Sequence, residues 1–404
     1  MAAPATVAAA GYFSVSRAGA VVGDGIVRMR TATKGVLELG GQTVTLTGDA
    51  AAKTLKGKLG GQAFDLKIKT RNLLSGKVGA DKLELVRQVS RPIPAVEVAK
   101  FDAGPPAGIQ AILTATPDYL AATADPSIFW HHFGNVFYRG RLDGTARLLG
   151  IASDPGPSEC LPFARRTLIG DSGQKTQGFL AKLGLTRRYV LVNAFAVAMR
   201  PRAKSKGLAV MQTNLAIKSA RHALYDALLG AGGLQAIVAF GDVAHRAYDI
   251  WKEATPAVSA VPVFKIAHPA AVDRDGSGDD AALKGWASAV KKLRAIVTPD
   301  PDGDADGPNF GKFFTEVDYV RIPREDFPKM TPAYVGDDSW GRAATPRHNN
   351  CCRRPSPDDL ESLILSPPAG LGQELRYRYQ SGVLSGARNK AGQPVAVDAL
   401  GIET

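Results

Sequence analysis

Residues 151–157 have the sequence Ile-Ala-Ser-Asp-Pro-Gly-Pro, and they follow an apolar run, Ala146 to Ile151. A second signal, His268-Pro269-Ala270, follows another apolar run, Val261 to Ile266. Each run has the length of a buried strand, and each ends near a side chain that can carry or donate a proton. In α/β proteins the ligand site lies at the carboxyl ends of parallel strands. These two points therefore indicate both the fold class and the place of the chemistry.

Helical patterns separate the strand-length apolar runs in the middle of the chain. The runs are Ala146–Ile151, Tyr189–Asn193, Ala236–Phe240 and Val261–Ile266. The helical patterns are Lys175–Leu183, Ala216–Leu229, Val243–Lys252 and Ala281–Ile296. Strands that alternate with helices form βαβ units, in which the strands are parallel and helices cover the sheet. We predict an α/β fold in residues 93–298, a three-layer sandwich with a mainly parallel four-stranded central sheet.

Residues 1–92 have the alternation of half-buried strands instead. The segments 36–39 and 63–68 alternate apolar and polar side chains, and Leu39-Gly40-Gly41-Gln42 recurs as Leu59-Gly60-Gly61-Gln62. Gly-Gly pairs between such strands favour tight hairpin turns. We predict a small antiparallel, β-rich accessory domain. Two roles stay open for it: it binds DNA or a partner, or it stabilises the protein and its assembly.

Residues 299–404 are rich in proline and arginine and have weak periodicity. We predict an irregular C-terminal extension that packs on the α/β domain. Four of its arginines surround the adjacent pair Cys351-Cys352: Arg342, Arg347, Arg353 and Arg354. A cluster of this kind is typical of a surface that lines a nucleic-acid groove.

The composition is that of an ordinary globular protein with a basic excess. Of 404 residues, 45% are hydrophobic and 22% are charged, and 50 lysines and arginines against 38 acidic residues give a net charge of +12. Such an excess favours a polyanionic partner, because phosphates neutralised by Lys and Arg release counterions. We expect DNA as the partner, although a basic surface that only aids solubility has the same composition. We expect a monomer, and no protein partner can be inferred.

Three cysteines limit the redox and metal chemistry: Cys160, Cys351 and Cys352. Three thiols cannot supply four ligands to an iron–sulfur cluster or to an all-cysteine zinc site, so we expect no metal. They fit a reducing, cytoplasmic location. The sequence has no run long enough to span a bilayer and no signal-peptide pattern at its start. It also lacks the G-x-S-x-G, P-loop and G-x-G-x-x-G motifs of other α/β enzymes.

Four side chains stand where they can carry chemistry. Asp154 leaves a strand at a Pro-Gly-Pro turn, where a carboxylate can orient water, although aspartate is also common in such turns. Phe163 follows a proline and can stack on a flat base or pack in the core. Asn193 ends its strand and can offer a donor and an acceptor to a base edge, or merely shape a loop. His268 can donate a hydrogen bond to developing negative charge.

In this order and at these strand ends, the four features resemble the uracil-DNA glycosylase superfamily. The matching elements are Asp154-Pro155-Gly156, Pro162-Phe163, Asn193 and His268-Pro269, all within residues 145–297. The helix start Gly170-Asp171-Ser172-Gly173 is similar to the broad-specificity branch of that superfamily. The resemblance covers neither the N-terminal β region nor the C-terminal extension.

The resemblance implies a monofunctional enzyme that flips a nucleotide out of DNA and hydrolyses its glycosidic bond, leaving an abasic site. Phe163 would stack on the base, and Asn193 would hydrogen-bond its edge. His268 would stabilise the departing base anion. Asp154 would position water and support an oxocarbenium-like sugar. This chemistry needs no cofactor, and no lysine stands out as a Schiff-base nucleophile.

A second group of residues is predicted to contact DNA: Ser172, Gly173, Arg165, Arg166 and Arg274. The first two lie at a helix start, where backbone N–H groups can hold a phosphate. Arg274 or Val272 can fill the gap that a flipped base leaves. The aromatic segment 129–138 is a further candidate for the pocket, although core packing is favoured for it.

The sequence differs from the family at the residues that limit the size of the base that the pocket accepts. Uracil-specific members carry a bulky or acidic side chain soon after the motif proline, whereas this chain has Gly156 and Pro157 there, with Glu159 farther along. We therefore expect Gly156 and Pro157 to contact the base in a pocket that is wider than that of the uracil-specific members. It would accept a 5-substituted or bulky modified cytosine, as in phage DNA, as well as or instead of uracil. Phage defence is a corresponding role.

Two alternatives stay open beside this hypothesis. One is a conventional uracil-DNA repair glycosylase. The other is a non-catalytic protein on the same fold that binds DNA or a modified base.

Overall fold

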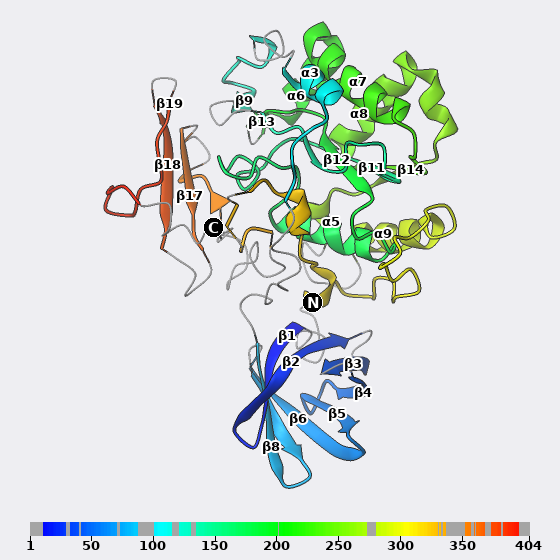
Figure 1. Cartoon of the computed structure of the whole chain (residues 1–404), viewed down its shortest axis with the longest axis vertical. Helices are drawn as coiled ribbons and strands as arrows, with labels where there is room; N and C mark the ends of the chain where they lie inside the picture. Colours follow the sequence, from blue (N-terminus) through cyan, green and yellow to red (C-terminus); the bar gives the residue numbers. More distant parts are fainter. Residues whose placement is uncertain are drawn as a thin grey trace.

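The computed structural model describes residues 11–29, 33–39, 42–70, 73–87, 101–114, 121–130, 135–200, 202–272, 280–329, 331–332, 334–336, 352–356, 359, 361–367, 373–380 and 383–395. An N-terminal β-barrel, an α/β core and a small C-terminal sheet follow one another along the chain (Figure 1). Across these residues, no helix combines the length and the apolar character that crossing a membrane requires.

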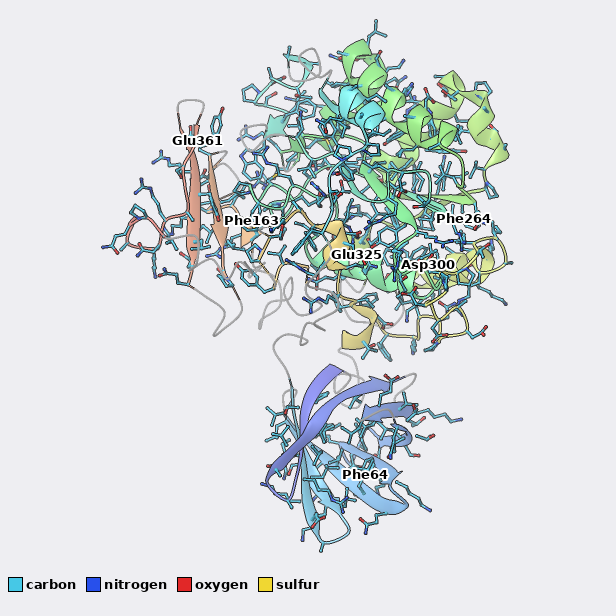
Figure 2. The ribbon with its side chains drawn as sticks, in the orientation of Figure 1. Phe64, Phe163, Phe264, Asp300, Glu325 and Glu361 are labelled. Atoms are coloured by element: carbon cyan, nitrogen blue, oxygen red, sulfur yellow. The ribbon has the colours of Figure 1, made fainter. Side chains whose placement is uncertain are left out.

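The N-terminal part is a closed antiparallel barrel. Its strands are β1 (Gly11–Arg17), β2 (Ala20–Met29), β3 (Lys34–Leu39), β4 (Gln42–Asp49), β5 (Thr54–Leu59), β6 (Gln62–Thr70), β7 (Leu73–Val78) and β8 (Asp81–Arg87). Strand β1 pairs with both β2 and β8, so the sheet has no free edge. Alternate side chains, among them Phe13, Leu55 and Phe64, fill the interior (Figure 2). The predicted antiparallel sheet is confirmed, and its closure is an addition to the prediction.

One of the two Gly-Gly motifs forms the predicted hairpin turn. Leu59 pairs with Gln62, and the two glycines between them, Gly60 and Gly61, have φ angles of +56° and +81°. Two consecutive residues in the left-handed conformation make a tight turn that matches the twist of the flanking strands. Glycine adopts this conformation without steric cost. The corresponding turn at 40–41 lies outside the described residues.

The central sheet contains the four predicted parallel strands and one further strand. Its order is β10 (Tyr138–Gly140), β12 (Tyr189–Asn193), β11 (Leu148–Ala152), β14 (Ala236–Phe240) and β15 (Val263–Ile266). The last four are parallel, whereas β10 pairs antiparallel with β12. The sheet therefore has five strands and not four. Strand β10 escaped prediction because it is short and centred on Arg139, whose burial depends on a carboxylate 187 residues farther along the chain.

Helices cover both faces of this sheet. Helices α5 (Asp171–Ala181) and α9 (Ala281–Leu293) pack on one face, and α3 (Ala107–Thr114), α7 (Leu215–Gly230) and α8 (Asp242–Ala254) pack on the other (Figure 1). Alternate strand residues divide between the two cores: Leu148 and Val238 face α5 and α9, whereas Leu149 and Ile237 face α7 and α8. This is a three-layer arrangement. The helix α6 (Lys204–Thr213) and the short pair β9 (Phe129–Trp130) and β13 (Ala198–Met199) were not predicted.

The C-terminal part contains regular structure, which differs from the expected irregular extension. Four strands, β16 (Cys352–Arg353), β17 (Ser362–Leu365), β18 (Leu375–Gln380) and β19 (Val383–Leu384), form an antiparallel sheet. Before it, the short 3-10 helices η3 (Glu316–Asp318) and η4 (Arg324–Asp326) lie in a segment whose Phe310 and Phe314 join the core beside α9. The alternation Leu375-Arg376-Tyr377-Arg378 was a signal that could have found β18, whereas β16, β17 and β19 have only two to four residues and show no period of their own.

A buried ionic network fastens this C-terminal segment to the central sheet. Asp326 is fully buried and accepts hydrogen bonds from Arg139 at 3.1 Å, from Arg141 at 2.6 Å and from the Tyr189 hydroxyl at 2.6 Å. Arg139 is also fully buried and donates to the carbonyl of Thr167. Because an unpartnered buried charge is costly, each member of the network depends on the others.

Replacing Asp326 with alanine should lower the free energy of unfolding by about 3–5 kcal/mol, because two arginines then lose their buried counter-charge. Urea denaturation of the full chain measures the loss. The control is Asp302→Ala, which removes an exposed carboxylate paired with Arg187. That change should cost less than about 1 kcal/mol, because solvent screens the pair. Equal losses in the two variants would contradict the role of the network.

Candidate active site

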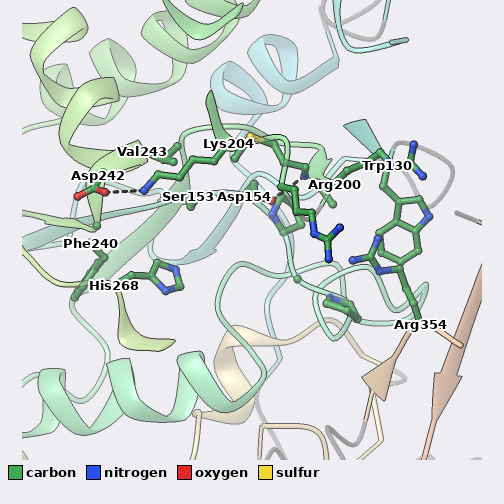
Figure 3. Close-up of a pocket in the computed structure, with 17 residues that line it drawn as sticks. Trp130, Ser153, Asp154, Arg200, Lys204, Phe240, Asp242, Val243, His268 and Arg354 are labelled. Atoms are coloured by element: carbon green, nitrogen blue, oxygen red, sulfur yellow. Dashed lines mark hydrogen bonds and ion pairs between the residues drawn. The ribbon is translucent and has the colours of Figure 1, made fainter. Parts of the chain in front are cut away.

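A pocket of about 450 Å³ opens at the carboxyl edge of the parallel strands (Figure 3). Three strand ends contribute to its lining: Asp154 follows β11, Asp242 follows β14 and His268 follows β15. The residues that line it are Trp130, Ser153, Asp154, Pro155, Gly156, Pro157, Ala198, Met199, Arg200, Arg202, Lys204, Phe240, Gly241, Asp242, Val243, His268 and Arg354. Its volume lies in the range of small-molecule sites, about 300–1,000 Å³.

The strand order explains why a pocket forms here. After β11 the chain moves outward to β12, and it then crosses back to β14 on the other side of β11. The loops that follow β11 and β14 therefore leave in opposite directions and leave a crevice between them. Such a topological switch point is where open α/β sheets bind ligands. The predicted pair Asp154 and His268 lies at this crevice, because β14 is the one strand between β11 and β15.

The Asp154 carboxylate is held in one orientation. One oxygen accepts a hydrogen bond from the Ser153 hydroxyl at 2.6 Å, and the other accepts from the Met199 backbone N–H at 2.8 Å. Burial raises the pKa of Asp154 above its ordinary value, and these two hydrogen bonds and the charge of Arg354 oppose the rise. The result is a fixed, partly desolvated carboxylate at the pocket wall.

His268 is a neutral hydrogen-bond donor at the opposite side of the pocket. Its Nδ1 accepts from the Ala270 backbone N–H at 3.2 Å, so the ring proton of the neutral imidazole is on Nε2. Burial lowers the pKa of His268 to about 4, and the charges of Lys175 and Lys204 add to this effect. The imidazole is therefore uncharged at neutral pH.

Gly241 lets the end of β14 come close to His268. Its φ is +83°, and a Cβ at this position would lie 2.9 Å from the Cβ of His268. A side chain here would have to displace the histidine as well as adopt a left-handed backbone. The position of His268 thus depends on a glycine at the neighbouring strand end.

Asn193 does not line the pocket, although the sequence predicted a base contact for it. Its side chain is buried and its Nδ2 donates to the Glu159 carboxyl at 3.3 Å. Within the described residues, its Oδ1 is buried and has no hydrogen-bond partner. Burial raises the pKa of Glu159 to about 8, so this carboxyl group carries a proton at neutral pH. The Asn193–Glu159 pair lies beyond the pocket lining.

Phe163 also lies away from the pocket. It packs edge-on against Tyr377 of the C-terminal sheet, with 6.3 Å between ring centroids, and its backbone carbonyl accepts from Thr331 (Figure 2). The ring is part of the cluster that joins the α/β core to this sheet. In this structure Phe163 packs in a hydrophobic cluster, which is the alternative to base stacking given above.

The residues predicted to contact DNA are scattered. Arg166 pairs with Asp102 at 2.7 Å and stacks over Tyr138, so its charge is already neutralised. Ser172 and Gly173 lie in the first turn of α5 and do not line the pocket. Arg165 is exposed. Arg274 lies outside the described residues, and Val272, the other candidate for filling the gap, is buried in the core.

The structure adds a cationic rim that the sequence did not assign to the site. Arg200, Arg202 and Lys204 come from the loop after β13 and the start of α6, and Lys204 pairs with Asp242 at 2.6 Å. Their closeness in sequence was a signal that could have found them. Arg354 comes from beyond β16 and stacks on Trp130, with 4.8 Å from guanidinium to ring centroid.

Neither comparison with known proteins nor a metal-binding cluster identifies the function of this pocket, so its function must be inferred from its geometry. No protein-family model matches the chain, and no curated protein is similar to it in sequence. In the part of the chain that the structure describes, no group of three or more His, Cys, Asp or Glu side chains is placed to hold a metal ion. Cys160 and Cys352 are both buried, and the Cys352 thiol donates to the Pro157 carbonyl at 3.3 Å.

Stability should fall as the pH rises from about 4.5 to about 8, because folded Glu159 keeps a proton that the unfolded chain has released. In Glu159→Gln this fall should be weaker, since the amide does not ionise. Urea unfolding at about pH 5 and about pH 8 measures the difference. Glu253→Gln, an exposed position at the end of α8, should follow the wild type. An unchanged pH dependence in Glu159→Gln would show that Glu159 ionises normally.

Proposed function

We propose that this protein is a DNA glycosylase of the uracil-DNA glycosylase type, which flips a modified pyrimidine out of DNA and hydrolyses its glycosidic bond. The observation that carries the proposal is the convergence of Asp154 and His268 on one pocket at the switch point of the sheet. These are the two residues to which the resemblance gives catalytic roles. The arginines of the cationic rim supply charge for a phosphate backbone beside the same pocket, whereas Lys204 is paired with Asp242.

The geometry suits a hydrolytic displacement at the sugar. Asp154 orients a water molecule and stabilises positive charge at C1′ while the bond to the base breaks. The oxygen of that water forms the new bond to C1′, and its proton passes to the Asp154 carboxylate. The base leaves with the bonding electron pair, and the Nε2–H of His268 donates a hydrogen bond to the resulting anion. A neutral imidazole can serve here because it does not need to transfer its proton.

The wide pocket rests on Gly156. A Cβ added to Gly156 would meet no atom within 4 Å, so the space beside this residue is open. Trp130 and Arg354 line the same pocket. This space favours a bulky 5-substituted cytosine, and an enzyme that releases uracil alone is the alternative. The proposed role in phage defence rests on this choice of substrate, whereas the proposed location, the cytoplasm, rests on the small number of cysteines.

Base release should be about 100- to 10,000-fold slower in Asp154→Asn and about 100- to 1,000-fold slower in His268→Ala. Single-turnover assays on duplexes that contain uracil or 5-substituted cytosines measure the rates as abasic sites. Wild-type rate should rise with pH through the raised pKa of Asp154, because its charged form is active. His268→Ala should keep this acid limb, because the histidine already is neutral above about pH 4. Asp154→Asn should lack it.

Two outcomes would overturn the assignment. Wild-type release that both variants retain would exclude Asp154 and His268 as catalytic residues. Tight DNA binding by the wild type without release of any base would favour the alternative of a non-catalytic binding protein. Unfolding midpoints equal to that of the wild type show that the variants fold.

Gly156→Leu should narrow the pocket and so reduce release of a bulky 5-substituted cytosine at least about 10-fold more than release of uracil. The measurement is the ratio of the two rates on otherwise identical duplexes. Gly108→Leu is the control, because an added Cβ there also meets open space, but in α3 and outside the pocket lining. Equal losses for the two bases in Gly156→Leu would mean that Gly156 does not set the size of the accepted base.

A further inference from the structure

One face of the barrel is strongly basic. Six exposed lysines lie on β5, β6, β7 and the turn before β5, and we call them the lysine face: Lys53, Lys56, Lys58, Lys67, Lys69 and Lys77. Among residues 54–59, 62–70 and 73–78, Asp65 is the one acidic residue. Residues 11–87 together contain 13 lysines and arginines against 6 acidic residues, so the barrel carries more than half of the net charge of +12.

The barrel geometry holds these lysines close together. Side chains alternate along each strand, so Leu55, Phe64 and Leu66 point into the core. The lysines occupy the alternate positions of the same strands and point to solvent. Strand register then aligns neighbours: Lys58 pairs with Ala63, and Lys77 is opposite Asp65. Successive outward positions on one strand are about 7 Å apart, and adjacent strands are about 4.8 Å apart. The face is therefore one continuous patch.

Most of this charge is not neutralised by the residues that the structure describes. Lys56 lies 3.3 Å from Asp65, and both side chains are more than half exposed. In the described part of the barrel, the other five lysines of the face form no ion pair. No lysine of the face is directly opposite another, but lysines at successive outward positions of one strand, such as Lys56 and Lys58, are about 7 Å apart and repel one another. A polyanion laid across the face would relieve this repulsion and release its own counterions.

We propose that the lysine face binds the phosphate backbone of double-stranded DNA. The outward positions of β5 to β7 carry no aromatic side chain, so the face lacks the stacking platform that single strands require. Lysine binds phosphate as a point charge, and contacts to phosphates carry no information about the base sequence. The barrel would thus add affinity that is independent of sequence and of the base in the pocket. This role goes beyond base excision and does not require it.

The test is the salt dependence of binding by the full chain. The variant Lys58→Gln/Lys67→Gln/Lys77→Gln removes three charges from the face. Its affinity for an unmodified duplex, measured by fluorescence anisotropy between about 50 and 200 mM salt, should fall with salt less steeply than that of the wild type. The slope of log K against log salt should be smaller by about 2–3, and binding at about 0.1 M salt should be at least about 10-fold weaker.

The control carries the same charge change elsewhere. Lys252→Gln/Lys291→Gln/Lys292→Gln alters exposed lysines at the C-terminal ends of α8 and α9. Because α8 starts at the pocket, its end lies at the opposite edge of the sheet. This control should keep the wild-type slope. An equal loss in both triple variants, or no loss in the first, would overturn the proposal.

Two further measurements separate this proposal from its alternatives. Vesicles of equal parts phosphatidylcholine and phosphatidylserine should bind more weakly than DNA at the same salt. Stronger binding to vesicles that is lost in the lysine-face variant would favour a membrane surface and overturn the DNA assignment. Base release at saturating protein should be unchanged in the lysine-face variant. A wild type that releases no base but binds DNA through the face would contradict the proposed function alone.

Discussion

The candidate site depends on the parallel pairing of four strands that end at one edge of the sheet. Ala152 pairs with Asn193, Ile151 with Ala239, and Phe240 with Ile266, so the loops after these strands leave at the same level. Because the strands are buried on both faces, a shift of one residue would turn their side chains to the wrong layer. Hydrophobic packing in the two cores thus fixes the positions of Asp154, Asp242 and His268 at the same time.

The electrostatics of the pocket are compatible with the chemistry that we propose. Burial disfavours the charge of Asp154, while the hydrogen bonds from the Ser153 hydroxyl and the Met199 backbone N–H and the charge of Arg354 favour it. His268 is kept neutral by burial and by nearby lysines, and its free donor is Nε2–H. A negative group and a neutral donor on opposite sides of a pocket suit a reaction in which the sugar gains positive charge and the base gains negative charge.

Segments outside the resembling region contribute to the site and to the stability of the core. Arg354, which follows β16, lines the pocket, and Asp326 neutralises Arg139 and Arg141 at β10. Val317 of η3 packs in the same cluster as the interior of the barrel. The three parts of the chain are therefore joined by side-chain contacts, and the pocket wall is not a property of the α/β core alone.

The alternation of strands and helices could be predicted from the amino-acid sequence, and so could the two residues, Asp154 and His268, that meet at the pocket. Both results follow from local periodicity, because a buried strand and the residue that ends it are visible within a few positions. Four features became visible only in the folded chain: the closure of the barrel, the strand β10, the packing of Phe163 on Tyr377, and the position of Arg354 at the pocket. Each of these features depends on a contact with a residue far away in the sequence, and the local periodicity of apolar residues does not reveal such contacts.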